Sequence, residues 1–268
     1  MLSTMRAHWP EYVSETLGLA TFMISAAFFA TLLQHPASPL AAWPATGIVR
    51  RLPMGIAMGL TAIGIIYSPL GARSGAHMNP AVTLTFLRLG KIAPHDAAGY
   101  MTGQFAGGLL GIGLGTALLA NLPADPPINY VATRPGPAGA AVALAAEAAI
   151  SFGMMLAVLA LSNSPRLRRL TGVAAGLLVC TYITVEEPLS GMSMNPARSL
   201  GPALLARSFE ALWVYFAGPL AGMALAAEAY VRARGRKAVR CAKLHHPAHV
   251  RCIFRCALHA QPEVTARA

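Results

Sequence analysis

Long apolar stretches alternate with short polar connections along most of this chain. Six stretches are weakly charged and close to the roughly 20 residues that a helix needs to cross a bilayer; they cover residues 12–33, 52–70, 97–119, 138–161, 170–185 and 211–231. The fifth stretch ends where Glu186 and Glu187 interrupt it. The first is too long for a cleaved signal peptide, and we expect it to stay in the mature protein. The pattern predicts an all-α membrane protein with six transmembrane helices.

The tripeptide Asn-Pro-Ala occurs twice, and each copy follows a Ser-Gly pair at the same interval; the residues are Asn79, Pro80 and Ala81, then Asn195, Pro196 and Ala197. Asn is a preferred N-cap, and Pro is favoured at the first helical position because its missing N–H would have no partner there. Each triplet therefore starts a helix. Only the short helix-compatible runs 82–89 and 198–206 follow, too few residues to cross a membrane. We expect two re-entrant half-helices.

The segments 12–120 and 138–232 repeat one plan: a span with a glutamate, a second span, a half-helix and a glycine-rich third span. Because each repeat has three spans, the second enters the membrane inverted, and the half-helices meet near the middle. The glutamates, Glu15 and Glu147, need partners inside a membrane. We expect backbone N–H groups of 71–78 and 189–194 to supply them. The alternative places both glutamates near the membrane interface.

The charge distribution predicts the topology. The chain is 55% hydrophobic and 12% charged, with a mean hydropathy of +0.53 and a net charge of +11. These values exclude an ordinary soluble domain. The basic residues concentrate on one side of the spans, so the positive-inside rule places both termini, 1–11 and 233–268, in the cytoplasm. Aromatic residues do not accompany the basic ones, and we expect no nucleic-acid partner.

The segment 233–268 is basic and contains Cys241, Cys252 and Cys256 together with four histidines. We expect a disordered cytoplasmic tail that rests on anionic lipid and whose removal leaves the membrane domain active. The alternative is a structural zinc site. We disfavour it because Cys and His do not form two pairs at short intervals. No metal and no cofactor are therefore expected.

These residues together resemble the aquaporin, or major intrinsic protein, family. The resemblance rests on the motifs 74–83 and 190–199, on the two glutamates and on Gly218 and Pro219, and it covers about residues 11–232. It implies an inverted repeat of three plus three spans with two half-helices, making 12–232 a channel domain, with one pore per subunit and a homotetramer. We expect a multi-pass protein of a cell membrane, specifically a bacterial inner membrane. His77 is expected to support the first loop or to line the cytoplasmic pore entrance.

In this family the triplet asparagines face the pore, and a selectivity filter lies towards the extracellular side. Alignment with the family gives Met58, Ile183, Met192 and Arg198 as the filter residues here. Strict water channels carry an aromatic residue and a histidine at the first two of these positions. The present filter, apolar apart from Arg198, is similar to that of plant nodulin-like channels, and flexible methionines can admit solutes bulkier than water.

Other markers of the family point towards water channels. Glycerol facilitators carry Asp directly after the filter arginine and a basic residue four positions further on, where this chain has Ser199 and Ala203. Tyr215 and Phe216 also resemble the water-channel pattern.

We therefore expect a passive channel for water and small neutral solutes in a lipid bilayer, which excludes protons and ions. One alternative is a facilitator of the glycerol or metalloid type with low water flux. A second alternative is a secondary transporter, since such proteins also use inverted repeats and broken helices. We expect no enzymatic activity, because Ser, His and Asp do not form a recognisable catalytic frame.

Overall fold

The computed structural model describes residues 2–258, and every regular element in that range is a helix. Six long helices form the body: α1 (Leu2–Gln34), α2 (Gly47–Tyr67), α5 (Pro94–Leu118), α6 (Gly139–Ser162), α7 (Thr171–Val185) and α10 (Val214–Arg234). Short helices are α3 (Pro69–Ser74), α4 (Pro80–Arg88), α8 (Glu187–Ser190) and α9 (Pro196–Ala206). Single 3₁₀ turns are η1 (Pro39–Ala42), η2 (Leu122–Ala124), η3 (Asn129–Val131), η4 (Arg168–Leu170) and η5 (Arg236–Ala238).

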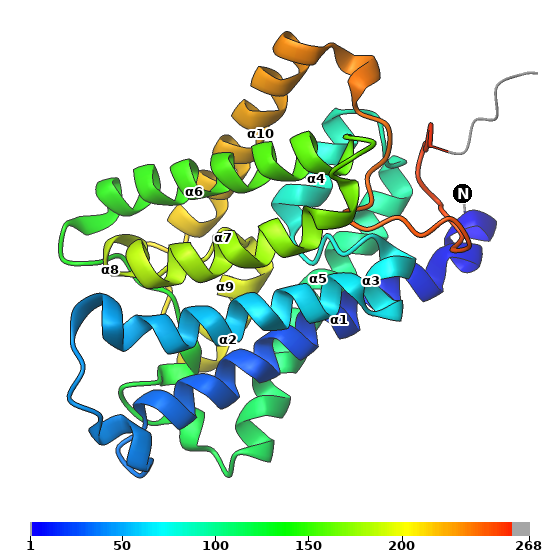
Figure 1. Cartoon of the computed structure of the whole chain (residues 1–268). Coiled ribbons are helices and arrows are strands. Elements are labelled where there is room, and N and C mark those ends of the chain that lie inside the picture. The colour runs from blue at the N-terminus through cyan, green and yellow to red at the C-terminus, as the bar shows by residue number, and fades with distance from the viewer. Residues whose placement is uncertain (1, 259–268) are drawn as a thin grey trace, which may run out of the picture.

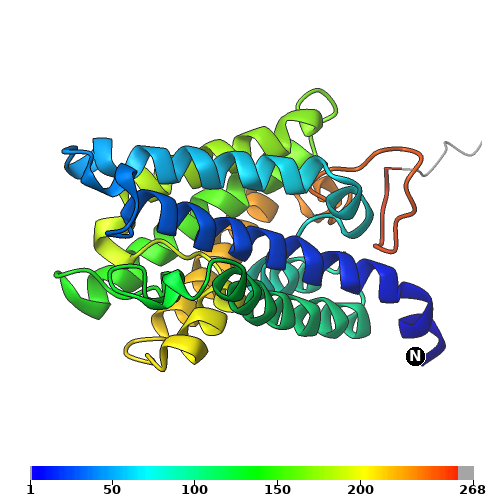
Figure 2. The same ribbon diagram turned by 90° about the horizontal axis from the view of Figure 1, so that it is seen from below.

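The long helices form a bundle whose two ends are different. Helices α1, α2, α6 and α7 run side by side (Figure 1). The start of α1 and the segment 239–258 lie at the same end, which we call the tail end (Figure 2). The connections 35–46 and 119–138 lie at the opposite end, which we call the loop end.

Four of the described helices, α1, α2, α6 and α10, are long and apolar enough to cross a membrane on their own account. Helix α5 has 25 residues but contains polar Asp96 and Gln104, and α7 has only 15 residues. Helices α5 and α7 are the third and the fifth of the six long helices, where the repeated plan of the sequence predicts spans. The prediction of an all-α fold with six spans and two half-helices is confirmed.

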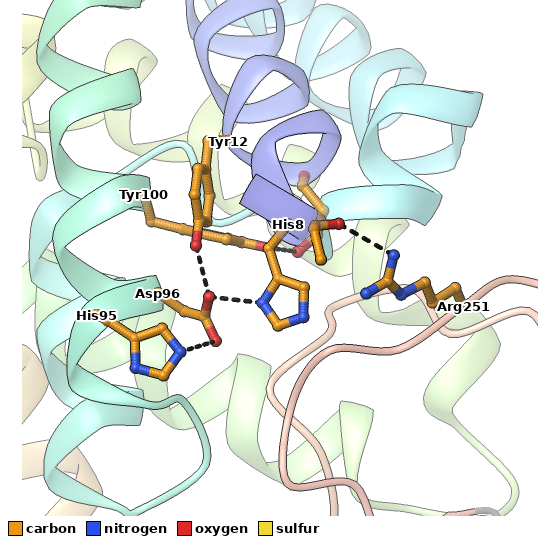
Figure 3. A network of polar contacts seen from close by, with 8 residues as sticks. His8, Tyr12, His95, Asp96, Tyr100 and Arg251 are labelled. Carbon is orange, nitrogen blue, oxygen red and sulfur yellow. Dashed lines mark hydrogen bonds and ion pairs between the residues drawn. The ribbon is translucent and has the colours of Figure 1, made fainter. Parts of the chain in front are cut away.

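Several helix boundaries differ from those expected from the sequence, and contacts in the structure explain two of the differences. Helix α1 begins at Leu2, so the described part of the N-terminal segment 1–11 continues the first span as a helix. Its extra turns are tied to the start of α5, since His8 Nδ1 lies 2.7 Å from Asp96 Oδ1 and the Tyr12 hydroxyl donates to the same oxygen at 2.6 Å (Figure 3). The second span ends earlier than expected because Ser68 caps a new helix, α3, that begins with proline.

Glycines bring the long helices into backbone contact. The helices pack in the pairs α1–α5, α6–α10 and α2–α7. A Cβ added at Gly107 of α5 would lie 2.4 Å from the Thr16 carbonyl oxygen, and one at Gly222 of α10 would lie 2.1 Å from that of Ala148. Because no side chain fits at these distances, the glycines fix the separation of the helices.

The half-helices link the two repeats. Helix α9, from the second repeat, packs on α5, and α4, from the first repeat, packs on α10. The contact of α9 with α5 is again made by small residues, because a Cβ at Gly108 would lie 2.3 Å from the Ala197 carbonyl oxygen. Each half-helix therefore depends on a spanning helix of the other repeat.

The tail differs from the expectation of a disordered segment. After η5, residues 239–258 pack on the tail end of the bundle, and Val239, Cys241, Lys243 and Phe254 are buried. The basic composition of the tail suggests disorder, but apolar residues lie between the basic ones. These apolar residues, Val239, Leu244 and Phe254, pack on the tail end of the bundle. The remainder of the tail, 259–268 with His259, lies outside the described residues.

Candidate functional site

Two loops precede the half-helices: the first loop, 75–79, leads into α4, and the second loop, 191–195, leads into α9. Asn79 and Asn195 each cap their own half-helix and form a hydrogen bond with the other loop. The side-chain oxygen of Asn79 accepts the Ala81 N–H at 2.8 Å, and that of Asn195 accepts the Ala197 N–H at 3.0 Å. Asn79 Nδ2 donates to the Met194 carbonyl, and Asn195 Nδ2 donates to the Met78 carbonyl, both at 2.7 Å. The two half-helices therefore meet with their N-termini together, as the sequence predicted.

A buried glutamate holds each loop in place. Glu15 accepts the backbone N–H groups of His77 and Met78, and it also accepts the Gln104 amide at 2.6 Å. Both glutamates are fully buried. The expectation that loop N–H groups partner Glu15 is confirmed.

The second loop repeats this arrangement. Glu147 accepts the N–H groups of Ser193 and Met194, both at 2.7 Å, and the Ser190 hydroxyl at 2.8 Å. Residues Met78 and Met194 both have positive φ, 47° and 56°. A non-glycine residue rarely adopts this conformation, and the hydrogen bonds to the carboxylates fix it.

Two tyrosines complete the repeat. The Tyr100 hydroxyl donates to the Ser74 carbonyl at 2.7 Å, and the Tyr215 hydroxyl donates to the Ser190 carbonyl at 2.6 Å. The contact of Tyr100 with the end of α3 was not predicted from the sequence. A signal for it exists, because Tyr100 precedes Gln104 and Tyr215 precedes Pro219 by the same four positions.

A cavity of about 720 Å³ runs between the helices and past the meeting point of the half-helices. We call it the lumen. Every predicted filter residue lines it, and so do His77, Asn79 and Asn195; the filter residues are Met58, Ile183, Met192 and Arg198. Pro80, Ala81, Pro196 and Ala197 lie behind the asparagines as the buried first turns of α4 and α9. The structure thus brings the predicted site residues together around one space.

The lining of the lumen combines apolar side chains with several bases. Met54 lines the lumen one turn from Met58 on α2, a position that the sequence analysis did not single out. Arg198 donates from Nη1 to the Val131 carbonyl at 3.0 Å. This hydrogen bond holds the guanidinium against η3. Among the described lining residues, Glu187 is the single acid, and the bases include Arg51 and Arg134.

The neighbouring acid, Glu186, is not among the residues that line the lumen. It is buried where the chain leaves α7, and this burial raises the pKa of its carboxyl to about 7. Glu187 instead lies 3.7 Å from Arg51. The two glutamates, adjacent in sequence, therefore occupy different environments.

His77 connects the lumen with the tail. Its ring lies between Phe86 and Phe254, with centroid distances of 5.1 and 5.3 Å and nearly parallel planes. Nδ1 lies 3.1 Å from Thr83 Oγ1, and Nε2 lies 2.9 Å from the Ala242 carbonyl oxygen, to which it donates. His77 thus supports the first loop, as expected, and also bonds to the tail, which was not.

The known proteins that resemble this chain belong to one family. The family described as major intrinsic protein matches residues 2–230. The putative aquaporin NIP4-1 of Arabidopsis thaliana is 39% identical over 169 residues, which are 63% of this chain and 58% of that protein. Aquaporin NIP2-3 of Zea mays is 35% identical over 196 residues, 73% and 63% of the two chains. The chain therefore spans less than two thirds of the length of these relatives.

A solved structure shares the fold. The aquaglyceroporin from Plasmodium falciparum superimposes with a TM-score of 0.68 over 83% of this chain and 95% of that chain, at 20% sequence identity. At this identity the likeness concerns the arrangement of helices alone.

Proposed function

Because the chain belongs to the major intrinsic protein family, we propose that it is a passive membrane channel for water and small neutral solutes. The observation that carries this proposal is the lumen in which Asn79 and Asn195 bond across to the opposite loops. The relatives in Arabidopsis and maize bear the name aquaporin. An enzymatic role has no support among the described lining residues, which offer no nucleophile paired with a base.

Exclusion of protons and cations follows from the electrostatics of this meeting point. The N-terminus of each half-helix carries roughly half a positive elementary charge, and the two ends face each other. Each asparagine amide has a second N–H beyond the one used in the crossing bond. A water molecule that accepts this N–H is held by its oxygen, so it cannot pass a proton along a continuous chain.

The loop-end wall sets the solute class. Arg198 offers fixed donors and a permanent charge, which orders a solute oxygen and repels cations. The facing side chains Met54, Met58, Ile183 and Met192 are apolar. We propose that this filter passes water together with small uncharged molecules such as ammonia, hydrogen peroxide, urea or an undissociated metalloid acid. The apolar side chains favour, as second candidate, a metalloid-type facilitator with low water flux.

We propose that the protein spans a cell membrane with both termini in the cytoplasm, which places the tail end inside and the loop end outside. The concentration of basic residues at the tail end supports this orientation. Exposed apolar side chains on the outer faces of the spans, among them Leu60, Leu114 and Leu177, suit lipid or neighbouring subunits of a homotetramer. The bacterial inner membrane stays a prediction, since the relatives named above are plant proteins.

Stopped-flow light scattering on proteoliposomes tests the channel. We expect the osmotic water permeability and the permeability to one or more of the named solutes to exceed those of empty liposomes. The variant Leu244→Ala is measured beside the intact chain, because Leu244 lines the tail end of the lumen. If neither protein raises the permeability to water or to any of these solutes, the proposal is wrong.

A further inference from the structure

Four side chains of the tail, Cys241, His246, Cys252 and Cys256, gather into one cluster. Their ligand atoms all lie within 4.8 Å of one another. Cys241 Sγ is 3.7 Å from Cys252 Sγ, and Cys256 Sγ is 3.4 Å from His246 Nε2. No metal site was expected from the sequence, because Cys and His do not form two pairs at short intervals. The folded tail brings Cys241 and His246 together with Cys252 and Cys256.

These separations match the edges of a tetrahedral zinc site. Zinc–sulfur bonds of about 2.3 Å and zinc–nitrogen bonds of about 2.0–2.1 Å imply sulfur–sulfur edges of about 3.8 Å and sulfur–nitrogen edges of about 3.6 Å. A disulfide would need the two sulfurs at about 2.05 Å, and all four cysteines of the chain are free. Three thiolates and an imidazole form the Cys₃His ligand set of structural zinc sites.

The residues between these ligands are the ones that cover the tail end of the lumen. Leu244 donates its N–H to the Gly75 carbonyl at 3.0 Å, and Lys243 Nζ donates to the Ala72 carbonyl at 2.7 Å. The carbonyl of Ala242 accepts from His77, and Phe254 stacks on the same ring. Each of these contacts therefore joins α3 or the loop that follows it to a tail residue that lies in sequence between two members of the cluster.

Leu244 lines two cavities. It lines the lumen, and it also lines a second cavity of about 270 Å³ beyond the tail end, which is bordered by Ser162, Arg168, His245 and His246. Further bonds hold the segment on three sides: Arg240 N–H donates to Asn163, Arg255 N–H to the Lys91 carbonyl, and Arg251 to the Ala7 carbonyl (Figure 3). The segment 239–258 therefore covers the lumen as a cap.

We propose that Cys241, His246, Cys252 and Cys256 bind one Zn²⁺ ion, and that this ion holds the cap closed over the tail end of the lumen. The physical reason is that the cap has no helix or strand of its own after η5. A short coil keeps one conformation at a high cost in chain entropy, which coordination by four ligands offsets. Removal of the ion frees Leu244 to leave the lumen and Phe254 to leave the His77 ring. The second part of this inference rests on the proposed channel function.

Metal binding is tested first, without any flux measurement. The purified full-length protein is analysed for zinc by mass spectrometry, and a Co²⁺-substituted sample is examined for the absorption bands of tetrahedral thiolate-bound cobalt. We expect one ion per chain, loss of the ion in the double variant Cys252→Ser/Cys256→Ser, and full retention in Cys180→Ser, whose cysteine lies on α7. Absence of metal, equal metal content in the tail variant, or a Cys241–Cys252 disulfide in the isolated protein would overturn the site.

The cap is tested by flux. Water permeability of proteoliposomes is measured before and after a membrane-permeable zinc chelator, and again after Zn²⁺ is returned. We expect a several-fold rise that zinc reverses, and a permanently raised permeability in Leu244→Ala with unchanged zinc content. A chelator-independent flux of the wild type would refute the cap. Zinc bound as expected, with no flux in any state or variant, would instead refute the channel and leave the metal site standing.

Discussion

At the scale of single residues, the two buried glutamates determine the geometry of the site. Each carboxylate accepts N–H groups from two consecutive loop residues, Ser193 and Met194 in the case of Glu147. A carboxylate accepts at both oxygens, whereas an amide accepts at only one. The hydrogen bonds to backbone donors therefore compensate for the cost of burying each carboxyl group.

The variant Glu147→Gln tests this role. Its amide group would face a backbone N–H donor, so one charge-assisted hydrogen bond is lost and the others weaken. We expect a loss of stability of about 2–3 kcal/mol, seen as a lower midpoint of thermal unfolding in detergent. Glu210→Gln, on the exposed connection after α9, serves as the control and should leave the midpoint unchanged. Equal midpoints of Glu147→Gln and wild type would show that the carboxylate is dispensable.

Glu186 predicts a pH dependence of stability. Its folded pKa is raised to about 7 by burial, whereas the ordinary value is 4.5. Between these two pH values the folded protein binds more protons than the unfolded chain, so stability falls as the pH rises through this window and stays low above pH 7.

The test compares thermal unfolding midpoints of wild type and Glu186→Gln from pH 4.5 to pH 8. The neutral amide removes the contribution of this carboxyl, so the variant should show a flatter profile and a higher relative midpoint at pH 8. Glu187→Gln, on the exposed neighbour, should keep the wild-type slope. Parallel profiles for Glu186→Gln and wild type would rule out this assignment.

At the scale of elements, the glycines of the spans set the distance between helices. Gly107 and Gly113 lie on the same helix, α5, but only the first meets a neighbouring backbone. A Cβ at Gly107 would lie 2.4 Å from the Thr16 carbonyl oxygen, whereas nothing lies within 4 Å of one at Gly113. An alanine at Gly107 therefore reports the cost of a methyl group between two helices. An alanine at Gly113 reports only its effect on the stability of α5.

We expect Gly107→Ala to separate α1 from α5 and to lower the yield of folded protein strongly. Gly113→Ala, in contrast, should be neutral or raise stability, since alanine favours a helix over glycine by about 1 kcal/mol. Size-exclusion profiles and unfolding midpoints of the two variants provide the measurement. A Gly107→Ala protein as stable as Gly113→Ala would contradict the packing role of this glycine.

The sequence predicted the elements better than it predicted the contacts between them. Span positions follow from hydropathy, and the half-helices follow from Asn-Pro capping, so both are local. The partner of His77 in the tail is not local, because Ala242 lies 165 positions away. The cysteine and histidine cluster was missed for the same reason. Its ligands come from parts of the tail that the packing of Phe254 and Leu244 on the bundle brings together, and no spacing rule describes this packing.

At the scale of the whole molecule, a channel and a carrier make different predictions. The lumen has no described acid beside its midpoint, where a coupled transporter would hold its driving ion; Glu187 lies at the loop end. We expect solute flux through the uncapped protein to rise linearly with the gradient and to be independent of Na⁺ and pH gradients. Flux measurements over a wide range of solute concentrations would test this. Saturation with ion dependence would establish a transporter instead.

The crossing contacts between the repeats also constrain how the chain matures. Helix α4 is synthesised before α10, on which it packs, and the Asn79 amide finds its acceptor at Met194 of the second repeat. A nascent first repeat inserted alone has neither partner. The narrow passage can thus form only after α9 and α10 have been synthesised and have joined the first repeat.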